Sequence, residues 1–245
     1  MMFKGGQDMI RVVCFDVWGT LLNIEAFYLE VARHVSNMTE REYSEVMEQL
    51  VRGYNKTKEM RRQGLFEEGK IVSQTLDVLS RESGVNIEIL RRAMARASYT
   101  IDPQRATIQG ALKAVREIKG LGLNTAILGN VLFWPGSFTR IIIERTGIGD
   151  YIDAQFYADE IGVSKPKREA FLTVTEYFRV DNPKSLVHVG DSIYEDFSGA
   201  LGFRAIGVLI DKNVNRPIVL GEYEACIIPE ISYLPSVIKN MTKNF

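Results

Sequence analysis

Short apolar runs and amphipathic stretches alternate through the second half of the chain. The apolar runs predict strands at 123–128, 154–158, 185–189 and 204–209. Helical spacing of apolar residues predicts helices at 111–119, 137–145, 166–178 and 193–201. Together with a further strand at 11–15, this alternation predicts an α/β fold with a doubly wound parallel sheet and right-handed crossovers.

The stretch between the first predicted strand and the later ones has a different pattern. Residues 23–105 contain no convincing strand, and they read as helices until Asp102 and Pro103 end the block. We therefore expect an α/β core made of residues 1–22 and 106–245, with an all-helical cap domain at 23–105 inserted after the first strand. An insertion of roughly 80 residues can hold a small core of its own.

Local signals predict some helix ends within this insertion. Thr39 and Glu42 have the spacing of a capping box, which predicts the beginning of a helix. A second helical pattern is expected to stop near Gly84. Asn86 is placed to cap a third helix at 87–97.

Composition narrows the classes of partner and location. The 245 residues carry a formal net charge of −1, which gives no reason to expect nucleic acid or an acidic membrane surface as a partner. Cys14 and Cys226 are far apart and make no disulfide framework, which fits a reducing compartment. No apolar run reaches the roughly 18 residues of a membrane span, and residues 1–10 lack the apolar stretch of a signal peptide. By elimination we expect a cytoplasmic protein.

Polar residues with catalytic potential follow several of the predicted strands. Asp16 ends the first strand, Lys165 follows the strand at 154–158, and Asp191 follows the strand at 185–189. Ligands bind outside the carboxyl ends of the strands in an open parallel sheet, so these groups are expected to share one crevice. A carboxylate nucleophile beside a hard cation and a fixed positive charge is the chemistry that this set predicts.

The polar segments, in this order, resemble the motifs of the haloacid dehalogenase (HAD) superfamily of hydrolases. The matching segments are residues 15–20, 129–130, 162–166 and 189–196. The similarity covers essentially the whole chain, because residues 23–105 lie where this family has its first-type cap and residues 225–237 resemble its closing strand and helix. A single such motif recurs by chance, but four in order make a strong signal.

The resemblance implies a role for two residues in covalent catalysis. It implies that Asp16 attacks an electrophilic phosphorus or carbon and becomes an acyl phosphate or an ester, which water then opens. It also implies that the ammonium of Lys165 neutralises the nucleophile and the transferring group. The small-molecule substrate is then expected to carry a phosphate.

The resemblance further implies a Mg²⁺ site. Asp16, Asp191 and the carbonyl of Trp18 would be a sufficient protein ligand set, with Asp196 bound directly or through water. Glu195 stands next to Asp196 in the sequence and is a possible substitute for it. Asp196 could instead serve as a partner of the helix dipole in the first turn of a helix.

Two positions depart from the family pattern. Phosphatases of the family carry a second Asp two residues after the nucleophile, where this chain has Trp18, and an indole is no general acid or base at neutral pH. The second motif usually ends a strand with Ser or Thr, where this chain has Gly129. Backbone N–H groups and the amide of Asn130 could still hold an oxyanion there.

Three hypotheses follow from the matches and the departures. The first is a Mg²⁺-dependent phosphatase suited to good leaving groups, which Asp191 and Asp196 motivate. The second is a dehalogenase-like hydrolase that acts at carbon, since an aromatic residue at Trp18 resembles the 2-haloacid dehalogenase branch. The third is a binding protein on a degenerate scaffold, which Trp18 and Gly129 together motivate. We weight the first most heavily, because metal ligands are hard to explain by anything but a metal.

The cap is expected to close over the crevice and to set substrate specificity. Its basic run of Lys56, Lys58, Arg61 and Arg62 is either a solvated helix face or the source of an arginine that reaches a carboxylate or phosphate of the substrate. Trp134 could form a wall of the pocket or pack under the cap. Apolar residues that the cap exposes could form a contact between two copies of the chain in a homodimer.

Overall fold

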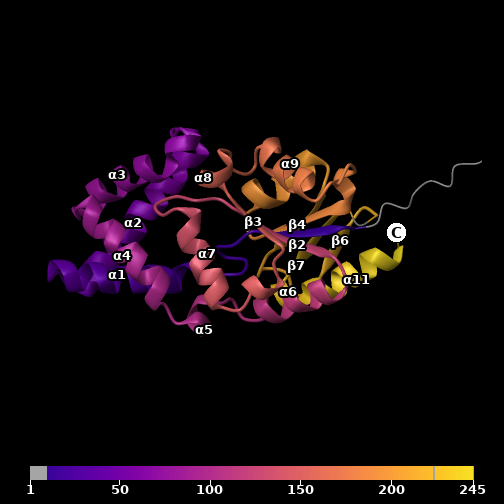
Figure 1. Cartoon of the computed structure of the whole chain (residues 1–245), viewed down its shortest axis with the longest axis horizontal. Helices are drawn as coiled ribbons and strands as arrows, with labels where there is room; N and C mark the ends of the chain where they lie inside the picture. The colour runs from indigo at the N-terminus through magenta and orange to yellow at the C-terminus, as the bar shows by residue number, and fades with distance from the viewer. Residues whose placement is uncertain (1–9, 223, 245) are drawn as a thin grey trace, which may run out of the picture.

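The computed structural model describes residues 10–222 and 224–244, and it has a sheet with its covering helices at one end and a bundle of helices at the other (Figure 1). The expectation that the first ten residues include no signal peptide falls almost wholly on residues 1–9, outside the described part. Within that part, no helix is both long enough and apolar enough to cross a membrane.

Seven strands of the described part form one sheet, in the order β3-β2-β1-β4-β5-β7-β6. Their bounds are β1 (Val12–Phe15), β2 (Asn124–Gly129), β3 (Ala154–Tyr157), β4 (Leu186–Gly190), β5 (Ile206–Ile210), β6 (Ile218–Leu220) and β7 (Ala225–Ile228). Neighbouring strands are parallel except β6, which pairs with β7 in the antiparallel sense. The predicted α/β class with a doubly wound parallel sheet is confirmed. The prediction missed β6, whose three residues are all exposed and so lack an alternating pattern.

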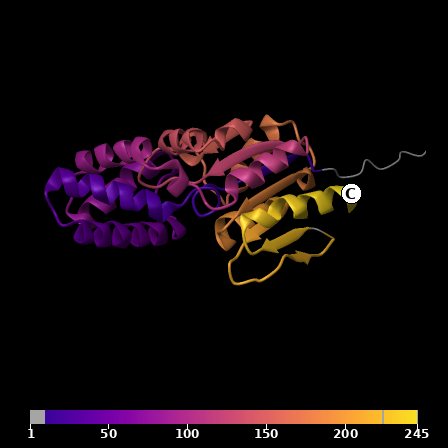
Figure 2. The same ribbon diagram turned by 90° about the horizontal axis from the view of Figure 1, so that it is seen from below.

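Helices cover both faces of this sheet. They are α6 (Ala111–Gly120), α7 (Gly136–Arg145), α8 (Ala158–Ile161), α9 (Arg168–Tyr177), α10 (Ser198–Phe203) and α11 (Leu234–Asn244). Val12 and Cys14 of β1 lie in one buried cluster with residues of α9 and α10, whereas Val13 and Phe15 lie in a second cluster with residues of α6 and α11. Alternate residues of a strand point to opposite faces, so each face of β1 is buried under its own helices (Figures 1 and 2).

The long insertion forms a bundle beyond the carboxyl ends of the strands (Figure 2). Its helices are α1 (Ile24–Thr39), α2 (Tyr43–Arg62), α3 (Ile71–Ser83) and α4 (Ile87–Thr100), and a short α5 (Pro103–Ala106) leads back to the sheet. Single 3₁₀ turns occur at η1 (Glu68–Lys70), η2 (Gly149–Tyr151), η3 (Pro183–Ser185) and η5 (Ile231–Tyr233). The buried apolar residues of the bundle are continuous with those on one face of the sheet. The division into a core and a separate cap domain at 23–105 stays a prediction.

Helix ends in the bundle follow the sequence signals at two places and depart from them at a third. The backbone of Gly84 is left-handed at the end of α3, and the side chain of Asn86 accepts a hydrogen bond from the N–H of Glu88 at the beginning of α4. The predicted capping box was wrong. Thr39 is the last residue of α1 and its hydroxyl donates to the carbonyl of Val35, while Glu42 precedes α2 without a side-chain cap. A threonine hydroxyl can satisfy the carbonyl four residues back, and here it does so.

Candidate active site

The predicted polar residues converge at the carboxyl end of the sheet. Asp16 follows β1, Asn130 follows β2, Lys165 follows β3 and α8, and Asp191 follows β4. These four strands are neighbours in the sheet, so their ends meet at one edge. A cavity of about 720 Å³ lies between this edge and the bundle. Most of the predicted site residues line it, namely Asp16, Trp18, Asn130, Trp134, Asp191 and Asp196.

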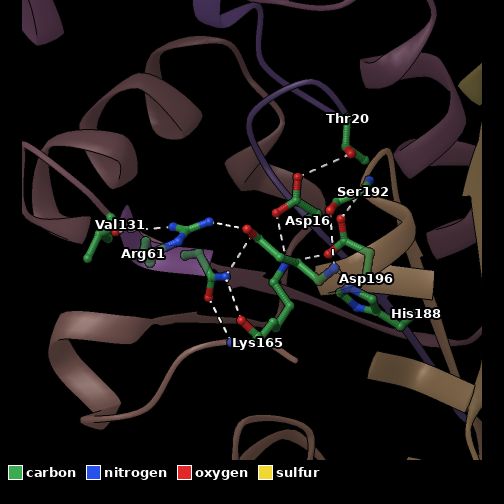
Figure 3. Close-up of polar contacts among 10 residues, drawn as sticks. Asp16, Thr20, Arg61, Val131, Lys165, His188, Ser192 and Asp196 are labelled. Atoms are coloured by element: carbon green, nitrogen blue, oxygen red, sulfur yellow. Dashed lines mark hydrogen bonds and ion pairs between the residues drawn. The ribbon is translucent and has the colours of Figure 1, made fainter. Parts of the chain in front are cut away.

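Lys165 joins two carboxylates at the floor of this site (Figure 3). Its Nζ lies 2.7 Å from Oδ1 of Asp16 and 2.6 Å from Oδ1 of Asp196. The Lys165 side chain is fully buried. Burial would lower the pKa of its ammonium, but the two carboxylates outweigh burial and hold that pKa above its ordinary value. Lys165 is therefore a permanent cation at this site.

Both carboxylate oxygens of Asp196 are engaged within the protein. Oδ1 also accepts a hydrogen bond from Nε2 of His188 at 2.9 Å, and Oδ2 accepts one from the backbone N–H of Ser192 at 3.1 Å. Burial would raise the pKa of Asp196, but Lys165 and His188 together hold it below its usual range. A Cβ on Gly190 would come within 2.2 Å of the Asp196 carboxyl carbon, so the close approach of this side chain requires glycine. Asp196 thus fixes Lys165 in place.

The segment that carries Asp196 is not the regular helix that the sequence predicted at 193–201. Residues 193–197 form a π-helical turn, η4 (Ile193–Phe197), and α10 begins only at Ser198. The backbone N–H of Phe197 donates to the carbonyl of Ser192, five residues earlier. Single π turns are frequent at functional sites, and this one directs Asp196 back over the end of β4.

Asp16 is buried at the edge of the cavity, and Asp191 is exposed to it. Oδ2 of Asp16 accepts a hydrogen bond from the Thr20 hydroxyl at 3.2 Å. Burial raises the pKa of Asp16 despite the opposing charge of Lys165, and burial and the charge of Asp196 raise the pKa of Asp191. Gly19, with a φ of +92°, lies so close to Asp191 that a Cβ there would come within 2.3 Å of its Oδ2. Burial and mutual repulsion therefore oppose the ionised form of both carboxylates.

This crowding fits a cation of the hard, oxygen-binding kind. Asp16, Asp191 and Asp196 offer ligand oxygens that all lie within 4.8 Å of one another. Lys165 supplies one positive charge against three carboxylates, so an excess of negative charge remains. Each carboxylate oxygen of Asp16 accepts only one hydrogen bond and keeps a lone pair for a metal, whereas Asp196 already holds three donors. The donors fit Mg²⁺, which prefers carboxylate oxygens and retains several waters.

Asn130 and Glu195 form contacts at this site that the sequence did not predict. The Asn130 amide accepts a hydrogen bond from the backbone N–H of Lys165 at 2.9 Å and donates to the carbonyl of Lys165 at 3.0 Å. It also donates to Glu195 at 2.9 Å, and Glu195 in turn pairs with Arg61 of α2. The Asn130 N–H groups are therefore occupied rather than free for an oxyanion. Glu195 faces Arg61 and Asn130, and among the described residues it is not part of the acidic cluster.

Aromatic rings form the wall of the cavity on the side of the bundle. Trp18 and Trp134 meet edge to face, with ring centroids 5.4 Å apart, and Tyr28 and Tyr54 line the cavity beside them. Trp134 also packs inward and donates from its indole N–H to the hydroxyl of Thr139, so it is both wall and core. The hydroxyl of Tyr28 is buried and has no hydrogen-bond partner within the described part of the chain.

Gly129 and Lys165 are the two predicted site residues that do not line the cavity, and for Gly129 the reason is local packing. A Cβ at this position would lie 3.0 Å from the ring of Tyr157 and 3.3 Å from Cγ2 of Val17. Packing of the Tyr157 ring against the end of β2 thus explains why the second motif lacks the usual Ser or Thr. A hydroxyl at this strand end would need the ring to move.

The basic run of α2 divides between solvent and cavity. Lys56 pairs with Glu82 of α3 on the outside of the bundle, as a solvated helix face would. Lys58, Arg61 and Arg62 line the cavity. Sequence reasoning missed Thr20 and His188, although both stand within the matched motif segments or directly before them. It also missed Tyr28, for which no local signal exists.

Comparison with known proteins gives a family match, a curated relative and similar solved structures. A family model described as haloacid dehalogenase-like hydrolase matches residues 10–203. Among curated proteins, the chain is similar to pyrimidine 5'-nucleotidase YjjG of Escherichia coli, with 27% identity over 94 residues, or 38% of this chain. The match spans only 40% of the length of that relative.

Solved structures resemble the chain over nearly its whole length. The putative HAD-hydrolase YfnB from Bacillus subtilis, bound to magnesium, has a TM-score of 0.73 at 16% identity and covers 94% of this chain and 99% of its own. L-2-haloacid dehalogenase from Xanthobacter autotrophicus, with chloropropionic acid covalently bound, has a TM-score of 0.68 at 17% identity and covers 95% of this chain and 100% of its own. At such identities the likeness shows the fold alone.

Proposed function

The chain belongs to the haloacid dehalogenase-like hydrolases, and on that premise we propose that it is a Mg²⁺-dependent phosphatase that acts on a small phosphorylated molecule. The observation that carries the proposal is the cluster of Asp16, Asp191 and Asp196, whose ligand oxygens lie within 4.8 Å of one another beside the buried ammonium of Lys165. Carbon–halogen hydrolysis offers no evident use for such an excess of negative charge.

In the proposed mechanism Asp16 is the nucleophile. Its carboxylate oxygen forms a bond to phosphorus while the ester P–O bond breaks, and the leaving oxygen departs with the electron pair. Water then attacks the phosphorus, the bond from phosphorus to Asp16 breaks, and the proton of the water passes to solvent. Lys165 stays charged throughout and neutralises the nucleophile and the transferring group.

A bound Mg²⁺ would be held by Asp16 and Asp191, with the Trp18 carbonyl as a further ligand and Asp196 acting through Lys165 or a water. It would supply Lewis-acid polarisation of the phosphoryl oxygens. Within the protein, Asp196 and Thr20 orient the reacting centre, since Asp196 holds Lys165 and the Thr20 hydroxyl binds Asp16.

The leaving group must depart with little proton transfer. Trp18 stands two residues after Asp16 and cannot donate a proton at neutral pH. Glu195 also lines the cavity, but its carboxylate is paired with Arg61 and is not free to donate a proton to the leaving group. We therefore expect substrates whose leaving group is already a weak base, such as acyl, enol or aryl phosphates.

The cavity favours a substrate with a planar or apolar portion. Its volume of about 720 Å³ exceeds what a phosphate alone would fill, and Trp18, Tyr28, Tyr54 and Trp134 supply its aromatic wall. Lys58 lines the same cavity and offers a positive charge to an anion. Since one relative is a pyrimidine 5'-nucleotidase, nucleoside monophosphates belong among the substrates to be tested.

A second candidate function is hydrolysis at carbon in the manner of a haloacid dehalogenase. The observation that favours it is Trp18, because a halide leaves without a proton and needs no general acid at that position. One solved structure of similar fold is an L-2-haloacid dehalogenase with chloropropionic acid covalently bound.

The deciding experiment measures product release with purified protein. Inorganic phosphate is assayed from p-nitrophenyl phosphate, acetyl phosphate, sugar phosphates and nucleoside monophosphates, with Mg²⁺ and with EDTA, for the wild type and Asp16→Asn. Turnover that requires both Mg²⁺ and Asp16 is the expected result. Halide release from 2-haloacids in EDTA, with no phosphate release, would establish the second candidate. Mg²⁺-dependent binding of phosphate without any turnover would indicate a binding protein.

A further inference from the structure

The last turn of α2 and the connection that follows it each contact the carboxyl end of the sheet, near the loop that carries Lys165. Arg61 forms an ion pair with Glu195 and donates to the carbonyl of Val131 at 3.5 Å (Figure 3). Glu68, in the 3₁₀ turn η1, accepts a hydrogen bond from the hydroxyl of Ser164 and pairs with Lys167 at 2.6 Å. Residues 61–70 therefore contact the Lys165 loop directly through Glu68 and indirectly through Arg61.

The indirect contact passes through a continuous set of hydrogen bonds. Glu195 receives Arg61 on one carboxylate oxygen and the Asn130 amide on the other. The same Asn130 amide holds Lys165 by its backbone N–H and its carbonyl. Arg61 is thus two side chains away from the backbone of Lys165.

We propose that residues 61–70 form a clamp that positions Lys165 when the helical bundle lies against the sheet, with Arg61 and Glu68 as positioning residues. The geometry of the reacting centre then depends on the bundle, because Lys165 must reach Asp16 and Asp196 together. The kinetic part of this inference rests on the proposed phosphatase function, whereas its structural part does not.

The ion pair of Arg61 with Glu195 is more deeply buried than that of Glu68 with Lys167, so we expect it to contribute more to the clamp. The side chains of Arg61 and Glu195 are only 14% and 12% exposed, so water and salt screen their attraction little. Lys167 is 55% exposed, and its ion pair with Glu68 contributes less. Misplacement of a reacting group by about 1 Å can cost about 100-fold in rate, so a loosened Lys165 loop has a large kinetic effect.

The chain offers a matched control for each variant. Glu68→Gln removes an ion pair between the bundle and the sheet, whereas Glu82→Gln removes the ion pair with Lys56, which lies wholly within the bundle. Arg61→Met removes the stronger contact, and Arg61→Lys keeps a charge that can still reach Glu195. The double variant Glu68→Lys with Lys167→Glu restores the ion pair but not the acceptor of the Ser164 hydroxyl, so its stability to urea separates the two contacts of Glu68.

Amide hydrogen exchange tests the structural part without any substrate. We expect Arg61→Met and Glu68→Gln to speed exchange in peptides that cover residues 162–168, while Glu82→Gln leaves these peptides as in the wild type. Unchanged exchange at 162–168 in Arg61→Met would overturn the clamp. This outcome is independent of whether the protein releases phosphate.

Steady-state kinetics tests the kinetic part. We expect kcat of Arg61→Met to fall about 10- to 100-fold with KM within about 3-fold of the wild type, and Arg61→Lys to recover part of the loss. Faster exchange at 162–168 with kcat equal to that of Glu82→Gln would overturn the positioning role. If even the wild type shows no turnover, the proposed function fails, and hydrogen exchange alone decides on the clamp.

Discussion

Asp196 binds Lys165 through an ion pair of 2.6 Å in which the two side chains are 2% and 0% exposed. Oδ1 of Asp196 therefore binds the ammonium of Lys165, and the further contacts of Asp196 with His188 and Ser192 leave its carboxylate little capacity for a metal. Asp191, five residues earlier in the sequence, forms no ion pair with any residue in the described part of the chain, which leaves its carboxylate available to a cation. Asp196 thus holds Lys165 and Asp191 is available to bind a metal, and substitutions at the two positions can separate these roles.

Asp191→Asn is predicted to weaken Mg²⁺ binding, whereas Asp196→Asn is predicted to destabilise the fold. We expect Asp191→Asn to raise the Mg²⁺ concentration at half-maximal binding at least about 10-fold with little loss of stability, because a ligand is lost and repulsion is relieved. Asp196→Asn should lower the free energy of unfolding by about 3 kcal/mol, since Lys165 then loses a buried partner. Titration calorimetry and urea unfolding measure the two effects. Equal loss of Mg²⁺ binding in both variants would contradict the assignment.

Lys165→Met is predicted to destabilise the protein and to make its stability depend more on Mg²⁺. Removal of the ammonium leaves Asp16 and Asp196 without their shared cation, which costs about 3–5 kcal/mol. Saturating Mg²⁺ should restore part of this loss, and restore more than it adds to the wild type. The thermal midpoint with and without Mg²⁺ checks this. Lys167→Met, at an exposed ion pair, serves as the control and should lose no more than about 1 kcal/mol.

Trp18→Asp is predicted to change which leaving groups react. A carboxyl two residues after Asp16 could protonate a poor leaving group, and such help is worth about 10²- to 10⁴-fold. We expect the ratio of activity on an alkyl phosphate to activity on an aryl phosphate to rise at least about 10-fold. Trp18→Asn opens similar space without an acid, so the same rise in that variant would refute the explanation. The loss of ring contacts with Phe27 and Trp134 is common to both.

Gly129→Ser is predicted to destabilise the protein rather than to improve phosphate binding. The new Cβ would lie 3.0 Å from Cδ1 of Tyr157, and overpacking of this kind costs about 1–3 kcal/mol. The double variant with Tyr157→Leu should lose less than the sum of the two single changes. Gly120→Ser is the control, because no atom lies within 4 Å of a Cβ there. Urea unfolding of the wild type, the two single variants, the double variant and the control gives the comparison.

Asp153→Asn is predicted to lose stability in a way that depends on pH. Burial alone would raise the pKa of Asp153, but the Lys119 ammonium at 2.5 Å and the Thr125 N–H at 2.9 Å hold it below its ordinary value. A lowered carboxyl pKa stabilises the fold above the ordinary value of about 3.9, and this contribution disappears as pH falls through the folded-state pKa. We expect Asp153→Asn to cost about 1 kcal/mol at pH 7.

The test of that sign is the pH series itself. The stability difference between the wild type and Asp153→Asn should shrink as the pH is lowered below about 4, because the wild type then loses the same charge. Asp150→Asn replaces an exposed aspartate for which the described residues offer no ion pair, and it should show no such trend. A difference that stays constant down to acid pH would contradict the linkage.

The sequence by itself determined the α/β fold class and the edge of the sheet where the polar residues gather. Buried strands are short apolar runs, and the residues that end them, such as Asp16, Asn130 and Asp191, are brought together by parallel pairing whatever the details of packing. Strands without that pattern escaped prediction, as the exposed β6 did. Where a residue has two local choices, as Thr39 did between a cap and a bond to Val35, the sequence cannot decide.

Only the tertiary structure decided what each polar residue binds. Glu195 and Asp196 are neighbours in the sequence, yet one faces Arg61 and the other Lys165, because successive side chains of a helical turn point in different directions and meet different parts of the fold. The contacts of Arg61 and Glu68 with the sheet join residues 134 and 96 positions apart, and no local pattern records such pairs. The sequence thus fixes which groups reach the site, while long-range packing fixes their partners and hence their chemistry.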